Sequence, residues 1–196
     1  LTDVDIISTS VKIGEFISPF YVVHYGLLYS EGSGTINEQF HWRKDSSLKY
    51  WNIDPPPLNE NESRKFFRNM SDWVVTNLVL HEGRYHLLYD FDWPYQKFPG
   101  DKLVGPWWSG LTDGYAIILM LRAFDSFGDL KYLEAAGKLY ESINTPIEKG
   151  GSLNLLGSDP WIEEYVDPRV ELKSLPCVLN GMVCALFGVI SYEEFF

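Results

Sequence analysis

Two long segments with almost no polar face constrain the fold of this chain most strongly. Residues 109–127 and 176–190 are apolar on nearly every side of a helix, and small residues such as Gly181 and Gly188 interrupt the second. A helix that is hydrophobic all round is typical of a protein interior or a membrane. The longest apolar run, residues 115–121, is far shorter than the roughly 20 residues that a membrane span needs. We therefore expect no membrane span and two buried central helices.

Two further segments have only one apolar face. From Ser63 onward, apolar residues recur at the i, i+4, i+7, i+8 spacing, and His81-Glu82-Gly83 is predicted to end that helix. Residues 129–143 repeat the pattern, with Glu134 and Lys138 paired on the polar face, and Thr145-Pro146 follows as a stop signal. Both segments are typical of outer helices that cover a buried layer.

Helices joined by loops, with short extended segments such as residues 85–91, predict an all-α fold. Inner apolar helices backed by amphipathic ones pack economically as a double layer of helical hairpins, an (α/α) toroid. Residues 191–196 read as the capped first turn of a further helix, so we expect the toroid to be incomplete at its C-terminal end. We predict a single domain over residues 1–196, with an irregular N-terminal segment, 1–62, and a helical core, 63–196.

Charge and residue counts narrow the class of function. The chain has 16 Lys and Arg against 27 Asp and Glu, a formal charge of -11, which disfavours nucleic acid as a partner because phosphate binding relies on cations. The four histidines lack the spacing of a metal site, so we expect neither a metal nor a cofactor. Cys177 and Cys184, seven residues apart on one predicted helical face, are expected to be two buried thiols.

The first candidate site is the run Gly105-Pro106-Trp107-Trp108-Ser109-Gly110, where the most apolar helix begins. Tryptophan faces stack on apolar planes such as those of sugars, and a helix N-terminus attracts anions such as carboxylates. The alternative is that Trp107 and Trp108 are core or capping aromatics. Because they are adjacent, we expect one of them to point away from the interior.

The second candidate site is the run Asp159-Pro160-Trp161-Ile162-Glu163-Glu164-Tyr165. Two carboxylates and a phenol in a loop bounded by Gly and Pro can supply a general acid or base. Glu163 and Glu164 would point in opposite directions if the chain is extended, so we expect one to face solvent and the other a cleft. On residue types alone, a solvated acidic loop is the alternative.

Three ordered segments share a pattern with a known family. They are the run Pro19-Phe20-Tyr21-Val22-Val23-His24-Tyr25-Gly26-Leu27, residues 105–110 followed by Gly114-Tyr115-Ala116, and Trp161-Ile162-Glu163-Glu164-Tyr165 followed by Val178-Leu179-Asn180-Gly181. In this order they resemble the D-glucuronyl C5-epimerase family, specifically its C-terminal catalytic domain. The resemblance extends from about residue 19 to 190 and implies an (α/α) toroid.

The resemblance also implies an activity, the inversion of C5 of D-glucuronic acid residues in a polysaccharide of the heparosan or heparan type, which gives L-iduronic acid. The reaction removes a proton next to a carboxylate and returns one to the opposite face. By their match to the family motif, Glu164 would be the base or its orienting partner, and Tyr165 a proton carrier. The expected substrate-binding residues are Tyr25, Trp107, Trp108, Arg122, Trp161 and Asn180.

Arg122 is included because a cation inside an apolar helix calls for a buried partner or a substrate carboxylate, with a salt bridge to Asp113 or Asp125 as the alternative.

The chain also departs from the family pattern. The family's further catalytic tyrosines lie beyond the Leu-Asn-Gly helix, so we expect an impaired activity for these residues alone. Residues 31–62 are too few to form the β-rich region that animal members have at this place. In this respect the chain is more similar to compact microbial or plant relatives. By resemblance, the compartment would be the Golgi lumen in a eukaryote, and otherwise the cytoplasm or exterior of a microbe.

Other functions stay open at this point. A uronate polysaccharide lyase shares the C5 proton abstraction, and a glycoside hydrolase would need a second carboxylate beside Glu164, for which Asp113 and Asp92 are candidates. A non-catalytic sugar-binding domain is a third alternative. The expected partner is a uronic-acid-containing polysaccharide, and a homodimer is a possible assembly.

Overall fold

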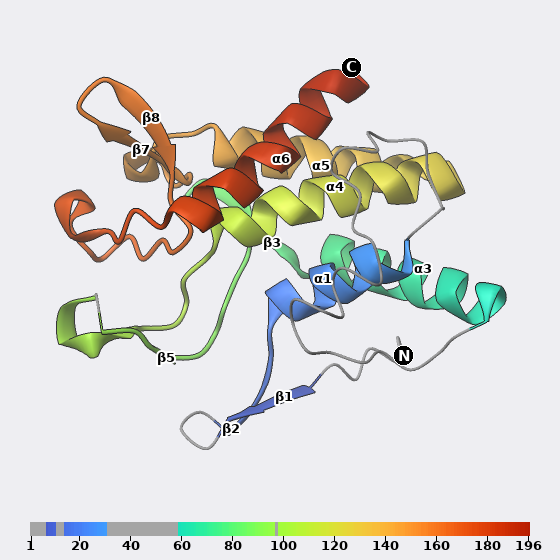
Figure 1. Ribbon diagram of the computed structural model, residues 1–196, viewed down its shortest axis with the longest axis horizontal. Helices are drawn as coiled ribbons and strands as arrows, with labels where there is room; N and C mark the ends of the chain where they lie inside the picture. The colour runs from blue at the N-terminus through green and yellow to red at the C-terminus, as the bar shows by residue number, and fades with distance from the viewer. Residues whose placement is uncertain (1–6, 11–13, 31–58, 97) are drawn as a thin grey trace.

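The computed structural model of the protein describes residues 7–10, 14–30, 59–96 and 98–196. Within them the chain is mainly helical, with several short strand pairs (Figure 1). The helices are α1 (Pro19–Tyr29), α3 (Glu60–Asn77), α4 (Gly110–Phe127), α5 (Leu130–Ile143) and α6 (Leu179–Phe195). The predominance of helix with short extended segments is confirmed.

The centre of the molecule is α4. Every side chain from Gly110 to Ala123 is buried, and α4 packs against α1, α3, α5 and α6. Its start is fixed by Ser109, whose Oγ accepts a hydrogen bond from Thr112 N at 3.3 Å. It ends at Gly128, whose φ of 69° suits a left-handed cap. The prediction of a buried helix over residues 109–127 is therefore confirmed.

Helix α6 crosses α4 at very short range. A Cβ atom on Gly188 would lie 2.2 Å from the carbonyl oxygen of Gly114, and one on Gly114 would lie 2.6 Å from Cα of Ala185. The described residues do not cover the opposite face of α6, where Leu179, Val183 and Ile190 are exposed. The expectation that both apolar helices are central thus holds for α4 but is wrong for one face of α6 in the described chain.

Both ends of α3 differ from the prediction. Helix α3 ends at Asn77, and residues 81–83 instead belong to a hairpin of β3 (Leu78–His81) and β4 (Arg84–Leu87). Glu82 and Gly83, with φ of 49° and 86°, form its turn. At its N-terminus α3 starts at Glu60, with a capping box between Asn59 and Glu62.

The C-terminal helix also differs from expectation. Helix α6 starts at Leu179 and continues to Phe195, so residues 191–195 extend it and do not begin a new helix. Cys177 precedes the helix with a φ of 47°, so Cys177 and Cys184 do not share a helical face, and both are free thiols.

The N-terminal segment is more ordered than predicted. Residues 1–62 contain the antiparallel pair β1 (Ile7–Ser10) and β2 (Gly14–Ile17), followed by α1. Pro19 occupies the first turn of α1, where its fixed φ suits a helix start and its missing N–H costs nothing. The β1–β2 pair was not predicted, and residues 31–58 of this segment lie outside the described residues.

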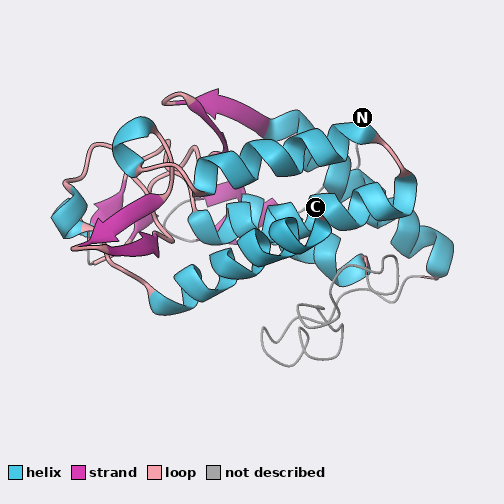
Figure 2. Cartoon of the chain, turned by 90° about the horizontal axis from the view of Figure 1, so that it is seen from above, coloured by secondary structure: helices cyan, strands magenta, loops and turns pink. Residues whose placement is uncertain are grey.

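The remaining strands form two-stranded antiparallel pairs beyond the N-terminal end of α4 (Figures 1 and 2). They are β5 (Trp93–Pro94) with β6 (Lys102–Leu103), and β7 (Leu153–Leu156) with β8 (Asp159–Ile162). Both candidate segments lie in this loop-rich end. Among the described residues, no helix combines the length and apolar character that crossing a bilayer requires.

Candidate active site

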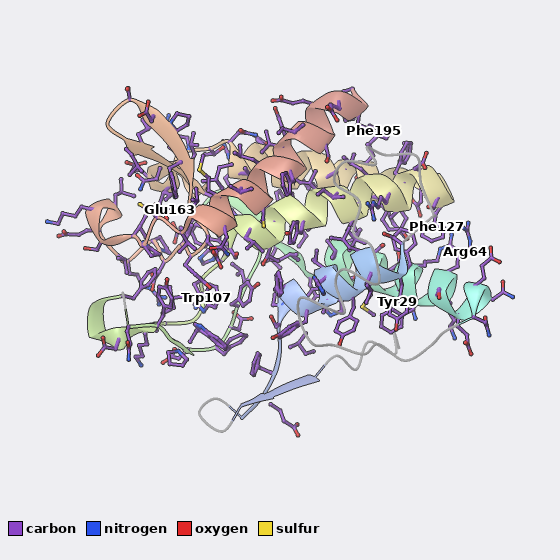
Figure 3. The ribbon with its side chains drawn as sticks, in the orientation of Figure 1. Tyr29, Arg64, Trp107, Phe127, Glu163 and Phe195 are labelled. Carbon is purple, nitrogen blue, oxygen red and sulfur yellow. The ribbon has the colours of Figure 1, made fainter. Side chains whose placement is uncertain are left out.

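Main-chain hydrogen bonds join the two candidate segments side by side. Trp108 N donates to Val166 O at 3.1 Å, and Val166 N donates to Trp108 O at 3.0 Å. Gly110 N donates to Glu163 O at 3.2 Å, and a Cβ on Gly110 would lie 2.4 Å from that oxygen. The start of α4 and the Glu-Glu-Tyr run therefore form one unit, with Trp107 and Glu163 at the same end of the molecule (Figure 3).

Glu164 is the most unusual group in this unit. Its residue is 8% exposed, and its Oε2 atom is buried without a hydrogen-bond partner among the described residues. Burial raises the pKa of the Glu164 carboxyl, and a hydrogen bond with Tyr165 opposes that rise. Gly181, in the first turn of α6, packs against it so closely that a Cβ there would lie 2.3 Å from Oε2. A buried carboxyl with a free oxygen is suited to accept a proton.

Tyr165 is half-buried beside Glu164. Its ring lies 4.9 Å from that of Tyr95 and 5.8 Å from that of Trp107, between ring centroids. Burial, and after it the nearby Glu164 carboxylate, raises the pKa of the Tyr165 phenol, so the phenol keeps its proton at neutral pH. The pair thus places a proton acceptor next to a proton donor.

The two tryptophans belong to the same unit as the Glu164–Tyr165 pair. Trp107 is 3% exposed, stacks on Tyr89 at 3.9 Å between centroids, and donates from Nε1 to Phe91 O at 2.9 Å. Trp108 is fully buried, and its Nε1 donates to Ser152 Oγ at 3.1 Å. The expectation that one indole points away from the interior is wrong, because the Trp107 ring stacks on Tyr89, the Trp108 ring stacks on His86, and both residues are buried. The structure shows a buried position for both.

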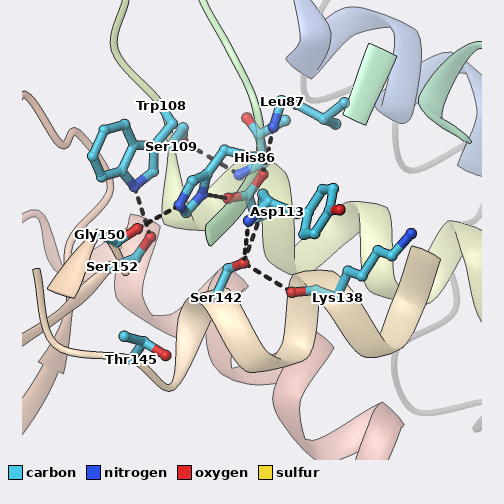
Figure 4. Close-up of polar contacts among 12 residues, drawn as sticks. His86, Leu87, Trp108, Ser109, Asp113, Lys138, Ser142, Thr145, Gly150 and Ser152 are labelled. Atoms are coloured by element: carbon cyan, nitrogen blue, oxygen red, sulfur yellow. Dashed lines mark hydrogen bonds and ion pairs between the residues drawn. The ribbon is translucent and has the colours of Figure 1, made fainter. Parts of the chain in front are cut away.

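A buried histidine and aspartate brace the start of α4 (Figure 4). His86 Nδ1 lies 2.8 Å from Asp113 Oδ2, His86 Nε2 lies 2.7 Å from Gly150 O, and both side chains are fully buried. Leu87 N donates to Asp113 Oδ1, and the His86 ring stacks on Trp108 at 4.5 Å. Burial raises the pKa of Asp113, and the bond to His86 opposes that rise.

This His86–Asp113 pair was not predicted as a unit. The available signal was an aspartate at the start of an otherwise apolar helix. The contacts of Asp113 also decide two alternatives from the sequence analysis. Both of its oxygens accept hydrogen bonds, from His86 and from Leu87. Asp113 is therefore neither a carboxylate free to work with Glu164 in a hydrolase nor the partner of Arg122.

Asp92, the other carboxylate considered for a hydrolase, is also engaged. Its Oδ2 pairs with Lys102 Nζ at 2.7 Å, and its Oδ1 accepts a hydrogen bond from Gly105 N at 3.1 Å. These contacts lower the pKa of Asp92, first through the bond to Lys102. Asp92 thus holds a surface loop in place.

Glu163 is fully buried, and the prediction that one of the two adjacent glutamates faces solvent is wrong. Its Oε1 accepts from Asn154 Nδ2 at 2.9 Å, and its Oε2 accepts from Cys177 N at 3.2 Å. Both adjacent side chains are buried because β7 packs over Glu163 and α6 packs over Glu164. Glu163 therefore ties together the segments around Glu164.

The other predicted binding residues are spread over the molecule. Asn180 is exposed in the first turn of α6, next to Gly181, and Trp161 is half-buried in β8. Tyr25 is half-buried on α1 against the large core. Arg122 is buried and donates to Ser30 Oγ at 2.9 Å, twelve residues along α4 from Gly110, which is about 18 Å. The structure does not bring Arg122 to Glu164, and the binding roles of these residues stay predictions.

Among the described residues, no group of three His, Cys, Asp or Glu side chains is arranged to hold a metal ion. A buried carboxyl with a free oxygen lies beside a phenol that keeps its proton, an arrangement that can accept and donate a proton. The chain belongs to the D-glucuronyl C5-epimerase C-terminus family, whose pattern matches residues 82–195.

Two curated proteins are similar to the chain. A D-glucuronyl C5-epimerase of Caenorhabditis elegans is 29% identical over 138 residues, which is 69% of this chain and 20% of that protein. An uncharacterized protein of Methanocaldococcus jannaschii is 28% identical over 102 residues, which is 50% of this chain and 32% of that protein. The chain therefore spans about a fifth to a third of these relatives.

Proposed function

We propose that the protein inverts C5 of D-glucuronic acid residues within an unsulfated polysaccharide of the heparosan type, giving L-iduronic acid. The observation that carries the proposal is the Oε2 atom of Glu164, which is buried beside the Tyr165 phenol without a partner among the described residues. Membership in the epimerase family supports the proposed substrate class.

The two pKa directions support an assignment of roles. A hydrogen on carbon next to a carboxylate is a very weak acid, so its removal needs a base held close and a stabilised, enolate-like intermediate. Glu164, whose raised pKa makes its carboxylate the better proton acceptor, is proposed as the base. Tyr165, whose phenol is hydrogen-bonded to Glu164, is proposed as the proton carrier on the same face, and return of a proton to the opposite face needs a second donor.

The substrate carboxylate is proposed to bind at the start of α6. Unlike α3, α4 and α5, this helix begins without a side-chain cap, so its first N–H groups and partial positive charge are available to an anion. Gly181 of the same turn touches Glu164, and Asn180 is exposed beside it. This arrangement would place the carboxylate and its neighbouring carbon next to the base.

The fold proposal is that the described helices are part of an (α/α) toroid. A buried α4 with the amphipathic α3 and α5 packed against it supports an inner and an outer layer. In such a toroid, the loop-rich end would be the opening where the polysaccharide binds.

The test is incubation of the complete polypeptide with an unsulfated glucuronan in deuterated water, followed by NMR of the product. We expect deuterium at C5 and iduronic acid. Glu164→Gln and Tyr165→Phe should abolish or greatly reduce both signals. Glu141→Gln and Tyr140→Phe, which change an exposed carboxylate and a phenol bonded to Glu193, should not.

Absence of deuterium at C5 in the wild-type product would refute the proposal. A product that absorbs in the ultraviolet would instead identify a lyase, because elimination leaves an unsaturated sugar. Undiminished turnover in Glu164→Gln would show that the base lies elsewhere.

A further inference from the structure

One arginine connects the two halves of the candidate site. Arg169 Nε donates to Asp167 Oδ1 at 2.6 Å, and its NH2 group donates to Asp167 Oδ2 at 3.0 Å. The same guanidinium donates to the carbonyl oxygens of three consecutive residues, Val104, Gly105 and Pro106. A single side chain thus bridges the Glu-Glu-Tyr segment and the loop that leads to Trp107.

The loop is held from its other side as well. Gly105 N donates to Asp92 Oδ1 at 3.1 Å, and Asp92 is itself paired with Lys102. A Cβ on Gly105 would lie 2.8 Å from Phe91 N, so the loop has no free space against the segment around Phe91. Residues 104–106 are therefore held by hydrogen bonds on two sides. Asp92 accepts from the N–H of Gly105, and Arg169 donates to the three carbonyl oxygens.

These hydrogen bonds lie next to Tyr165, the proposed proton carrier. Trp107 follows the clamped residues directly, and its ring lies 5.8 Å from that of Tyr165. Asp167, the carboxylate that orients Arg169, is two residues beyond Tyr165 and 4% exposed. Any movement of the loop would shift the indole against which the phenol packs.

We propose that Arg169 is a positioning residue for the Glu164–Tyr165 pair. By clamping residues 104–106 to Asp167, it fixes Trp107 and thereby the orientation of the Tyr165 phenol. The inference rests on the proposed function for its effect on turnover, and on the contacts of Arg169 alone for its effect on the loop.

The geometry calls for arginine specifically. A planar guanidinium can bind a carboxylate in bidentate fashion and still direct donors at neighbouring carbonyls, whereas a lysine offers one compact charge. The Arg169 side chain is 48% exposed, so its ion pair contributes little to global stability. Small displacements of catalytic groups can nevertheless lower rates strongly, up to about a hundredfold for 1 Å.

The test compares Arg169→Lys with Arg64→Lys in the complete polypeptide. Arg64 is a matched control because it also donates to a backbone carbonyl, that of Ser126, but at the far end of α4 (Figure 3). For Arg169→Lys we expect kcat of C5 exchange to fall about tenfold or more, with KM changed by less than about twofold, and no change for Arg64→Lys. Added guanidinium should restore part of the kcat of Arg169→Ala.

A second measurement separates this inference from the proposed function. Hydrogen exchange should be faster in Arg169→Ala than in Arg64→Ala for the Trp108 and Val166 amides, which bond the two segments to each other, and for the Trp107 amide, which donates to Tyr89 O. If the wild-type protein shows no C5 exchange, the proposed function fails and amide exchange alone decides whether the clamp exists. Unchanged amide exchange, or a kcat of Arg169→Lys equal to that of wild type, would overturn the inference.

Discussion

At the scale of single residues, Glu164 combines a chemical role with a cost in stability. Its Oε2 is buried without a partner among the described residues, and burying an unpaired polar atom costs about 1–3 kcal/mol. Glu164→Gln removes the charge while keeping the shape. We expect this variant to unfold at higher temperature than wild type at pH 7, although it loses the proposed activity. Thermal unfolding followed by circular dichroism measures the difference.

The pH dependence of that gain follows from the pKa of Glu164. Because burial raises this pKa in the folded state, the folded protein binds more protons than the unfolded chain between the ordinary carboxyl pKa and the raised value. The contribution of Glu164 to stability is therefore lost as the pH rises through this window. The advantage of Glu164→Gln should vanish below the ordinary carboxyl pKa, about 4.3.

The neighbouring glutamate provides the control. Both Glu163 oxygens accept hydrogen bonds, from Asn154 and from Cys177, so Glu163→Gln should lower the free energy of unfolding at neutral pH. A lower stability of Glu164→Gln than of wild type at pH 7 would contradict this account of the unpaired oxygen.

The residue types of the site could be predicted, but their environments could not. The Glu-Glu-Tyr run and the paired tryptophans were identified as chemistry-bearing segments. Their burial follows from the bridge between Trp108 and Val166 and from the packing of Gly181 on Glu164, which are contacts between distant parts of the chain. The prediction that one of two adjacent glutamates faces solvent therefore failed, because other parts of the chain pack over both Glu163 and Glu164.

At the scale of elements, the crossing of α4 and α6 depends on two glycines. A Cβ on Gly188 would lie 2.2 Å from a backbone oxygen of Gly114, which cannot rotate away. We expect Gly188→Ala to lower the free energy of unfolding by about 1–3 kcal/mol through overpacking. Denaturant unfolding measures this change.

Gly137 of α5 is the matched control. It is also inside a helix, but a Cβ there would meet only the Tyr192 hydroxyl at 3.2 Å, at the end of a side chain that can shift. Gly137→Ala should be neutral or stabilising by up to about 1 kcal/mol, because alanine favours helix over glycine. Equal effects of the two substitutions would show that the close crossing is unimportant.

The His86–Asp113 pair joins β4 to the start of α4. Asp113→Ala would leave His86 Nδ1 and Leu87 N buried without their acceptor. We expect a loss of about 3–5 kcal/mol in the free energy of unfolding, as for other buried pairs with one partner removed. Glu141→Ala, which breaks an exposed 3.7 Å ion pair with Arg84, should cost at most about 1 kcal/mol in the same assay. Similar losses in both variants would contradict a structural role for the buried pair.

Helix positions were predictable for α4, from its apolar run on every side, and for α5, from its amphipathic period, and both helices start at capping side chains. The end of α3 was not, because Leu78 to His81 continues the apolar pattern while pairing as a strand with β4. The turn signal at Gly83 was correctly located but assigned to a helix end, since glycine at positive φ serves both structures. Single-helix patterns carry no information on such pairing.

At the scale of the whole molecule, the chain charge of -11 opposes an anionic sugar polymer. Screening shortens the reach of this repulsion from about 30 Å at 0.01 M salt to about 8 Å at 0.15 M. We expect the Kd for an unsulfated glucuronan oligosaccharide to fall as salt is added, and isothermal titration measures it. A neutral oligosaccharide of equal length should show no such trend. Weaker glucuronan binding at higher salt would instead indicate that local cations dominate.

The bridge between Trp108 and Val166 has a consequence for how such a protein can change over generations. Both of its hydrogen bonds are made by peptide groups, which every residue except proline possesses in full. Mutation can therefore alter the side chains at either position without releasing one segment from the other. A backbone pairing of this kind keeps two short motifs in register while the surrounding residues are substituted. Distant homologues can therefore share short similar segments within otherwise divergent chains.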